Sequence, residues 1–284
     1  MNRRIFALLA AALLVLSVSG CTEKAAVQAQ TDLLATTQPV YQLANALTDG
    51  TGLTVSLLIS EPVSCLHDYT LTVSQMEKIE NAKLVLESGL GLGDFMADAL
   101  SGKVRIVVSS TLPTLEGDEG IDPHWWLDPT RFRAAAKLTA QELGSQYPEF
   151  SDQIAENFAA FDKKLSELQS YGDEALKNLS CRELVTFHDG FSYFADSFGL
   201  TIAAAMEVES GSEPSAKELE AIVSIVEKEK IPAVFTETNG ETGPAQVVAN
   251  ETGCKVYTLD MAISNADYFA AMRENINTIK EALG

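Results

Sequence analysis

Short apolar segments rich in β-branched residues alternate along the chain with longer segments whose apolar residues recur every three or four positions. Eight of the apolar segments have the length of strands, four in each half of the chain. They are Asp32–Ala35, Leu53–Ile59, Leu84–Ser88, Val104–Ser109, Glu183–His188, Thr201–Met206, Ala233–Glu237 and Lys255–Asp260. This alternation predicts an α/β fold of two lobes, each with a four-stranded, mainly parallel sheet flanked by helices.

Helix start signals stand between these strands. Ser74 with Glu77, and Ser215 with Glu218, have the spacing of capping boxes. Asp128 before Pro129 is typical of an N-cap followed by proline in the first turn.

The middle of the chain breaks the alternation. From Pro148 to Leu179 one helical pattern runs without an internal proline, and Gly172 is a point where it could bend. About 28 helical residues would extend roughly 40 Å, which is longer than one small domain is wide. We therefore expect an N-terminal lobe (32–145), a rigid connecting helix (146–179) and a C-terminal lobe (180–284).

The first residues have the pattern of an export signal. Residues 1–20 have a basic start followed by an apolar run that is too short to span a bilayer. Small residues then precede Cys21, which is typical of a lipoprotein signal with lipidation at Cys21; an ordinary secretory signal with a chance cysteine is the alternative. Residues 21–31 read as a polar leash. We expect an extracytoplasmic protein anchored to a membrane by lipid.

The net charge of the chain limits the classes of molecule that it is expected to bind. The 40 acidic and 20 basic residues give a formal net charge of −20. Such a surface repels nucleic acid, so nucleic-acid binding is excluded, and it attracts cations. We expect a monomer.

All three histidines follow predicted strands. His67 lies after Leu53–Ile59, His124 after Val104–Ser109, and His188 at the end of its own strand. Ligands of parallel α/β sheets bind outside the carboxyl ends of the strands. Two histidines come from the first half and one from the second, so a shared site would lie between the lobes.

A strand-end carboxylate of the second half would complete such a site. Asp260 is the better placed, and Glu237 is the reserve. A helix cap and a solvated loop acid are their respective alternatives. Three imidazoles with one carboxylate favour Zn(II), whereas Mn(II) prefers more oxygen ligands. Four protein ligands leave no position for an activated water, which argues against a zinc hydrolase; no His-Glu-x-x-His motif occurs.

Several segments together resemble the zinc and manganese solute-binding lipoproteins of ABC transporters, some of which are labelled adhesins. They are QPVYQLA, HDYTLTVSQMEKIENAKLVLESGLGL, DPHWWLDP, FHDGFSYFADSFGL, EPSAKEL and the terminal YTLD. The resemblance covers nearly the whole chain after the leader. It implies two lobes joined by a long helix, a metal between them, and delivery of that metal to a membrane permease.

The resemblance also implies that His67, His124, His188 and Asp260 are the ligands. Histidine at the third position is similar to the zinc-type members, whereas manganese-type members have glutamate there. Chelate-binding or adhesive lipoproteins with the same two lobes are a further alternative, disfavoured by the few basic residues in the motifs.

Two departures from the family stand beside the motifs. Cys65-Leu66 replaces the usual acidic-proline pair before the first histidine, so Cys65 is a possible additional ligand, with a small buried turn residue as the alternative. A short acidic segment, residues 115–122, replaces the histidine-rich loop of many zinc-type members, which puts a metal-delivery role of this loop in doubt.

The remaining predictions concern the structural roles of cysteine, tryptophan and phenylalanine residues. A Cys181–Cys254 disulfide requires neighbouring strand starts, which the usual strand order would separate. Trp125 and Trp126 are expected at the mouth of the cleft, with core filling as the alternative. The three phenylalanines of FSYFADSF have helical spacing and are expected in the core.

Overall fold

The computed structural model describes residues 30–60, 69–117, 120–206, 214–263 and 267–284. The leader, Cys21, Cys65 and His67 lie outside the described residues, so the expectations for them stay predictions. Among the helices of the described ranges, none combines the length and the apolar character that crossing a membrane requires.

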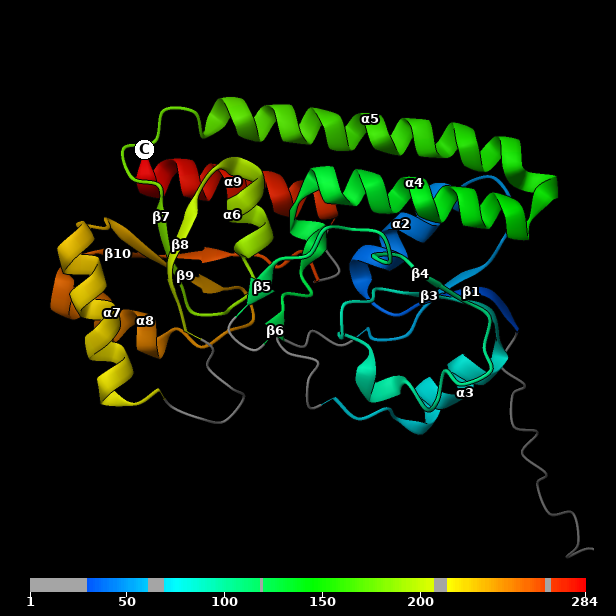
Figure 1. Ribbon diagram of the computed structural model, residues 1–284, viewed down its shortest axis with the longest axis horizontal. Coiled ribbons are helices and arrows are strands. Elements are labelled where there is room, and N and C mark those ends of the chain that lie inside the picture. Colours follow the sequence, from blue (N-terminus) through cyan, green and yellow to red (C-terminus); the bar gives the residue numbers. More distant parts are fainter. Residues whose placement is uncertain (1–29, 61–68, 118–119, 207–213, 264–266) are drawn as a thin grey trace, which may run out of the picture.

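The first sheet forms the centre of an N-terminal lobe (Figure 1). Its strands are β1 (Thr31–Ala35), β2 (Val55–Leu57), β3 (Ala82–Glu87) and β4 (Arg105–Val107), all parallel and in the order β2-β1-β3-β4. The edge strands β2 and β4 are shorter than predicted, with three residues each. Helices α2 (Gln38–Thr48) and α3 (Val73–Asn81) and the 3-10 turn η1 (Asp94–Met96) belong to this lobe.

The second sheet forms the C-terminal lobe. Its strands are β7 (Glu183–Thr186), β8 (Thr201–Ala205), β9 (Ala233–Glu237) and β10 (Lys255–Leu259), all parallel and in the order β10-β9-β7-β8. Each sheet therefore has its first strand between its second and third. Helices α6 (Ser192–Phe198), α7 (Ala216–Glu229) and α8 (Gly243–Thr252) complete the lobe. The predicted fold class is confirmed, with four parallel strands in each lobe.

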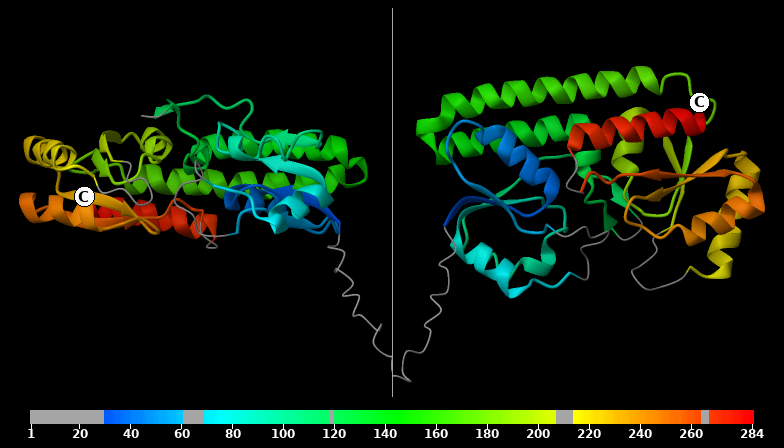
Figure 2. Two further views of the ribbon diagram at one scale, coloured as in Figure 1. Left: turned by 90° about the horizontal axis from the view of Figure 1, so that it is seen from below. Right: turned by 180° about the vertical axis from the view of Figure 1, so that it is seen from behind.

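A helical layer joins the two lobes. The connecting helix α5 (Ser151–Ala175) has 25 residues, about 37 Å at the usual helical rise, and is preceded by the 3-10 turn η3 (Pro148–Phe150). Helices α4 (Pro129–Gln146) and α9 (Tyr268–Leu283) both pack against α5 (Figure 2). The connection is therefore a layer of three helices rather than one isolated rod.

Gly172 has a packing role rather than the expected bend. Helix α5 continues through Gly172 to Ala175. A Cβ atom at this position would lie 2.2 Å from Cε1 of Phe198, a ring of α6. The glycine thus lets the connecting helix approach the C-terminal lobe closely.

The helix start signals were predicted correctly in two cases of three. Ser215 forms its capping box with Glu218, and Asp128 caps α4. The box predicted at Ser74 is wrong. The N-cap of α3 is Thr72, whose hydroxyl accepts a hydrogen bond from the backbone N–H of Gln75, while the Gln75 side chain accepts from the Thr72 backbone.

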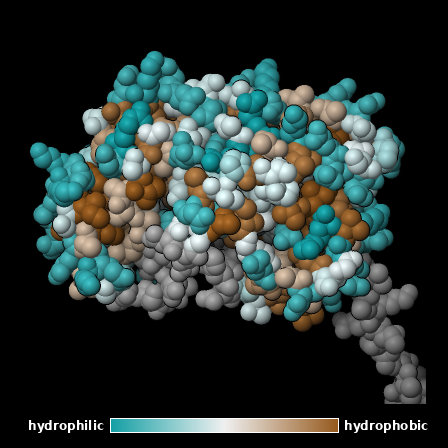
Figure 3. All heavy atoms as spheres, in the orientation of Figure 1, coloured by the Kyte–Doolittle hydropathy of each residue, from teal (hydrophilic) through white to brown (hydrophobic). Residues whose placement is uncertain are grey.

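One buried cluster extends through both lobes and the helical layer. It includes Leu33 of the first sheet, Leu165 of α5 and Phe235 of the second sheet. Phe191, Phe194 and Phe198 are buried, as predicted. Hydrophilic side chains are spread over both lobes and along α5 on the face that Figure 3 shows, with smaller apolar areas between them.

Candidate metal centre

Three candidate ligands of the C-terminal lobe stand at the carboxyl ends of adjacent strands. His188 follows β7, Glu237 ends β9, and Asp260 follows β10. Neighbouring registers pair Thr186 of β7 with Phe235 of β9, and Leu259 of β10 with Glu237. His188 and Glu237 are buried, and Asp260 is half-buried. The strand order thus places a histidine, a glutamate and an aspartate at the carboxyl ends of three adjacent strands.

His124 approaches this edge from the other lobe. It immediately precedes the 3-10 turn η2 (Trp125–Leu127), and its ring centroid lies 5.2 Å from that of His188. The side chain of His124 is 12% exposed. Two of the three predicted histidine ligands are therefore neighbours across the lobe interface.

The third histidine, His67, lies outside the described residues. Within the part of the chain that the structure describes, no group of three or more His, Cys, Asp or Glu side chains is arranged to hold a metal ion. The full ligand set, and any part for Cys65, therefore stay predictions.

Asp260 is held by the last helix. Its backbone N–H donates to Oδ1 of Asn275 at 2.8 Å, and Nδ2 of Asn275 donates to the Asp260 carbonyl at 2.7 Å. The backbone N–H of Ala262 donates to Oδ1 of Asp260 at 2.7 Å. Asp260 is not the cap of α9, since that role belongs to Asp267. The reciprocal bonds with a buried asparagine fix the backbone from which this carboxylate projects.

The two tryptophans are core residues rather than residues of the cleft mouth, because both are at most 1% exposed. The indole N–H of Trp125 donates to Oγ of Ser88 within the N-terminal lobe. Trp126 lies edge-on to the His124 ring, with 5.3 Å between the ring centroids. The core alternative is therefore correct, and Trp126 also supports a candidate ligand.

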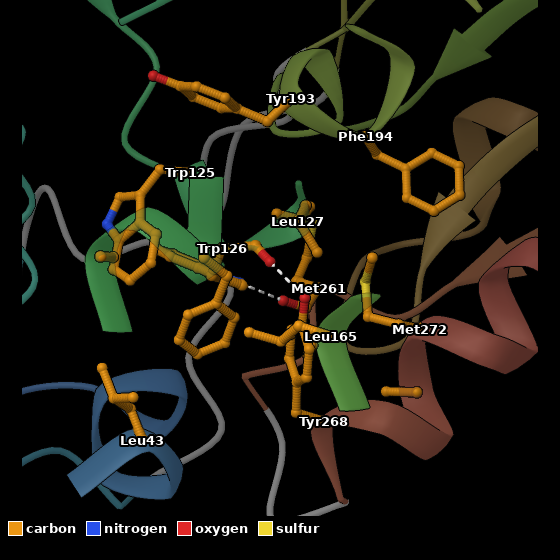
Figure 4. Packing of buried hydrophobic residues seen from close by; sticks show 14 of the residues in the cluster. Leu43, Trp125, Trp126, Leu127, Leu165, Tyr193, Phe194, Met261, Tyr268 and Met272 are labelled. Atoms are coloured by element: carbon orange, nitrogen blue, oxygen red, sulfur yellow. Dashed lines mark hydrogen bonds between the residues drawn. The ribbon is translucent and has the colours of Figure 1, made fainter. Parts of the chain in front are cut away.

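Trp126 and Tyr268 join the two lobes through hydrogen bonds (Figure 4). The indole N–H of Trp126 donates to the carbonyl of Met261, and the Tyr268 hydroxyl donates to the carbonyl of Trp126 at 2.7 Å. Complete burial raises the pKa of the Tyr268 hydroxyl well above its usual value, so this group stays a protonated donor.

A second interlobe contact is ionic. Arg131 of α4 donates to Asp196 of α6 at 2.7 Å and also to Asp128. Burial alone would lower the pKa of the Arg131 guanidinium, but its hydrogen bonds to the two carboxylates raise it. The guanidinium also lies over the ring of Tyr193, 4.9 Å from the ring centroid.

The acidic segment 115–122 contributes a small hairpin between the lobes. Strands β5 (Glu116–Gly117) and β6 (Gly120–Ile121) pair antiparallel, and the residues that join them lie outside the described ranges. A Cβ atom at Gly117 would lie 2.9 Å from Oδ2 of Asp189, the residue after His188. The hairpin thus contacts the segment that carries His188.

Asp122, at the end of this hairpin, is a further residue of the candidate site that the sequence motifs did not single out. Its Oδ1 atom lies 2.8 Å from Nδ1 of His124 and accepts a hydrogen bond from the His124 backbone N–H. The Asp-x-His spacing in IDPH was the available signal.

Cys181 and Cys254 are free thiols, so the possible disulfide is absent. Cys181 precedes β7 and Cys254 precedes β10, and β9 separates these strands. Burial raises the pKa of the Cys181 thiol.

The chain resembles known metal-binding proteins in sequence. A family model described as "Zinc-uptake complex component A periplasmic" (ZnuA) matches residues 33–282. The zinc-binding lipoprotein AdcA of Streptococcus pneumoniae is 26% identical in an alignment that covers 96% of this chain and 60% of AdcA. The manganese-binding lipoprotein MntA of Bacillus subtilis is 26% identical in an alignment that covers 94% of this chain and 95% of MntA.

The fold also matches a solved structure. A crystal structure of ZnuA superposes with a TM-score of 0.80 at 28% sequence identity, covering 89% of this chain and 98% of that chain. The similarity therefore includes both lobes and the helical layer between them.

Proposed function

Because the chain belongs to the ZnuA family of metal-binding solute-binding proteins of ABC transporters, we propose that it captures one Zn(II) ion between its lobes for import. Members of this family are binding proteins and not enzymes, which removes the zinc-hydrolase alternative. In the proposal Zn(II) is the cargo, and a membrane permease receives it.

The position of His124 beside His188 carries the proposal. The two rings come from different lobes, yet their centroids are 5.2 Å apart, and two strand-end carboxylates lie on the same side of the second sheet. Imidazole nitrogen with carboxylate oxygen is a donor set that suits Zn(II). The proposed ligands are His67, His124, His188 and Asp260, with Glu237 as a possible substitute for Asp260.

Mn(II) is the second candidate cargo. The similarity to a manganese-binding lipoprotein favours it, as do the two carboxylates, Glu237 and Asp260, at adjacent strand ends. Against it stands histidine at position 188, because a third imidazole shifts the donor set from oxygen to nitrogen. We therefore rank Zn(II) first.

The proposed location is outside the cytoplasm, with a lipid on Cys21. Both AdcA and MntA are named as lipoproteins, which supports this placement. Lobes at 32–145 and 180–284, joined through 146–179, are proposed as the units between which the ion is bound and from which it is released to the permease.

Competition titration of metal-stripped protein tests the cargo. We expect one Zn(II) per chain, bound more tightly than Mn(II). His188→Ala should weaken Zn(II) binding by at least about 100-fold, since a four-ligand site loses one ligand. Gln141→Ala, on the exposed face of α4, is the control and should bind like the wild type. Equal Zn(II) affinity in His188→Ala and the wild type would reject the site, and tighter Mn(II) binding would reject the ranking.

A metal-bound crystal structure tests the fourth ligand. We expect an oxygen of Asp260 within about 2.2 Å of the ion. If an oxygen of Glu237 occupies that position instead, the assignment of Asp260 is wrong while the binding function stands.

A further inference from the structure

Asp122 stands at the end of β6, two residues before His124, and its side chain has no exposed surface. Its backbone N–H donates to the carbonyl of Leu115 across the hairpin at 2.9 Å. The backbone N–H of Leu115 in turn donates to the hydroxyl of Tyr193, a residue of the C-terminal lobe, at 3.0 Å. The carboxylate therefore projects from a backbone that is fixed to both lobes.

One carboxylate oxygen of Asp122 contacts a ring nitrogen of His124 and therefore bears on which tautomer the ring adopts. Oδ1 lies 2.8 Å from Nδ1 of His124. A carboxylate without a proton can only accept hydrogen bonds, so a charged Asp122 pairs with the His124 tautomer that carries its proton on Nδ1. In the neutral ring the lone pair then stands on Nε2, and only that nitrogen is available to a cation while the contact persists.

The other carboxylate oxygen, Oδ2, is buried, and no hydrogen-bond donor within the described ranges reaches it. A buried carboxylate that is incompletely hydrogen-bonded is unfavourable, because its charge has lost water without full replacement. A cation on Nε2 would supply positive charge on the far side of the ring that Asp122 contacts. Carboxylates behind metal-bound histidines raise the basicity of the ligand in this way.

We infer that Asp122 is a positioning residue for metal capture, which rests on the proposed function. Its carboxylate holds His124 in the Nδ1–H form, which leaves the Nε2 lone pair for a cation between His124 and the neighbouring His188. The negative charge of Asp122 also strengthens the bond from His124 to the ion. Asp122 itself does not contact the ion.

The tautomer of His124 in metal-free protein is the first test. Long-range nitrogen–proton NMR spectra of histidine-labelled protein distinguish the two neutral tautomers, and His124→Gln identifies the His124 signals. We expect an Nδ1–H ring in the wild type. In Asp122→Ala the signals should move toward the Nε2–H form, which free imidazole side chains prefer. A His124 tautomer that is the same in both proteins would overturn the inference.

Zn(II) affinity is the second test, measured by chelator competition in the same buffer for every variant. Asp122→Asn keeps the size of the side chain and an oxygen that can accept from Nδ1–H, but removes the charge. We expect its Zn(II) affinity to fall about 10- to 100-fold, the range typical of carboxylates behind metal ligands.

Asp162→Asn is the matched control. Asp162 lies on α5 and pairs with Arg133, so this change alters the net charge equally without touching a histidine. Its affinity should stay within about twofold of the wild type, because exposed charges are screened. Equal affinity of Asp122→Asn and Asp162→Asn would overturn the inference.

Zn(II) binding by the wild type separates the proposed function from the role of Asp122. If wild-type protein fails to bind Zn(II), the proposed function fails. If the wild type and Asp122→Asn bind Zn(II) equally tightly, the function stands and only the role of Asp122 is rejected. Thermal unfolding of each metal-free variant establishes that the comparison is made between folded proteins.

Discussion

The indole N–H of Trp126 donates a hydrogen bond to the backbone carbonyl of Met261, with 2.8 Å between nitrogen and oxygen. Trp126 stands two residues after His124, and Met261 directly follows Asp260. The bond therefore joins the two segments that carry proposed ligands from different lobes. Tyr268 donates its hydroxyl proton to the Trp126 carbonyl, and its backbone N–H donates to Oε1 of Gln42, also in the N-terminal lobe. The start of α9 is thus fastened to the opposite lobe.

Trp126→Phe should both lower the unfolding free energy of the protein and speed the release of Zn(II). Phenylalanine keeps an aromatic ring but leaves the Met261 carbonyl without its indole donor, which costs about 1–3 kcal/mol of unfolding free energy when the acceptor is buried. Denaturant unfolding measures the stability, and stopped-flow transfer to a chelator measures the release rate of Zn(II). We expect faster release because the two segments that carry proposed ligands lose a direct connection.

Trp125→Phe is the matched control for that variant. It removes a hydrogen bond of similar length, to Ser88, but within one lobe. A similar loss of stability with an unchanged Zn(II) release rate is expected. If both variants release Zn(II) equally fast, the interlobe bond has no special part in retention.

Gly172→Ala should destabilise the interface between α5 and the C-terminal lobe. The added methyl group would lie far inside contact distance of the Phe198 ring, and overpacking of this kind typically costs about 1–3 kcal/mol. That cost exceeds the roughly 0.5–1 kcal/mol that alanine gains over glycine within a helix. Unfolding in denaturant measures the difference.

Gly144→Ala provides the comparison, because a Cβ atom there meets nothing closer than 3.4 Å. It should leave the unfolding free energy unchanged or raise it by up to about 1 kcal/mol. In addition, Phe198→Leu should relieve the clash of Gly172→Ala. The double variant should therefore lose less unfolding free energy than the two single variants lose together. Full additivity would contradict the proposed contact.

Thr72→Ala should destabilise the protein by about 1 kcal/mol, because it removes the N-cap of α3. Ser74→Ala, which removes a side chain from the exposed face of the first turn, should change the unfolding free energy by much less. Thermal or denaturant unfolding of the two variants checks this. The opposite ranking would restore the capping box expected at Ser74.

The Arg133–Asp162 pair should stabilise the fold only above acidic pH. The hydrogen bond from Arg133 lowers the pKa of the Asp162 carboxyl, outweighing burial, which acts in the other direction. A lowered pKa in the folded state stabilises the protein above the ordinary aspartate value of about 4, and this contribution is lost as the pH falls through the lowered value. Because both partners are substantially exposed, screening limits the effect to about 0.5 kcal/mol.

Arg133→Gln measures that contribution. At pH 7 the variant should be less stable than the wild type by that amount, and the difference should shrink as the pH falls below about 4. Unfolding curves recorded at several pH values provide the test. A difference that stays constant across this range would show that Arg133 acts through packing rather than through the ion pair.

The first turn of α3 is a case in which the local sequence pattern did not determine the structure. The letters T-V-S-Q-M-E contain two overlapping capping-box patterns, one from Thr72 and one from Ser74. Tertiary contacts select the first, because the Gln75 side chain is buried and its amide donates to the Tyr69 hydroxyl and the Leu58 carbonyl. Both partners lie outside the six residues of the pattern, so the pattern alone contains no information about them.

The candidate site shows the same division. Strand periodicity sufficed to place His124 and His188 on one side of their sheets, since parallel strands end at a common edge. The residues that support the proposed ligands could not be predicted from local patterns, because they are distant in the sequence. Asn275 reaches Asp260 from 15 positions away, and Tyr268 reaches Trp126 from 142 positions away. The ligand role of His67 stays a prediction because the structure does not describe that residue.

By itself the sequence determined two parallel sheets, the long helix between them and the strand ends where the histidines stand, because alternation and periodicity are local properties that each segment carries alone. Tertiary structure decided the rest. The burial of both tryptophans, the close approach at Gly172 and the bond from Asp122 to His124 depend on where the lobes and loops meet. Those meetings result from packing over the whole chain, which no short segment specifies.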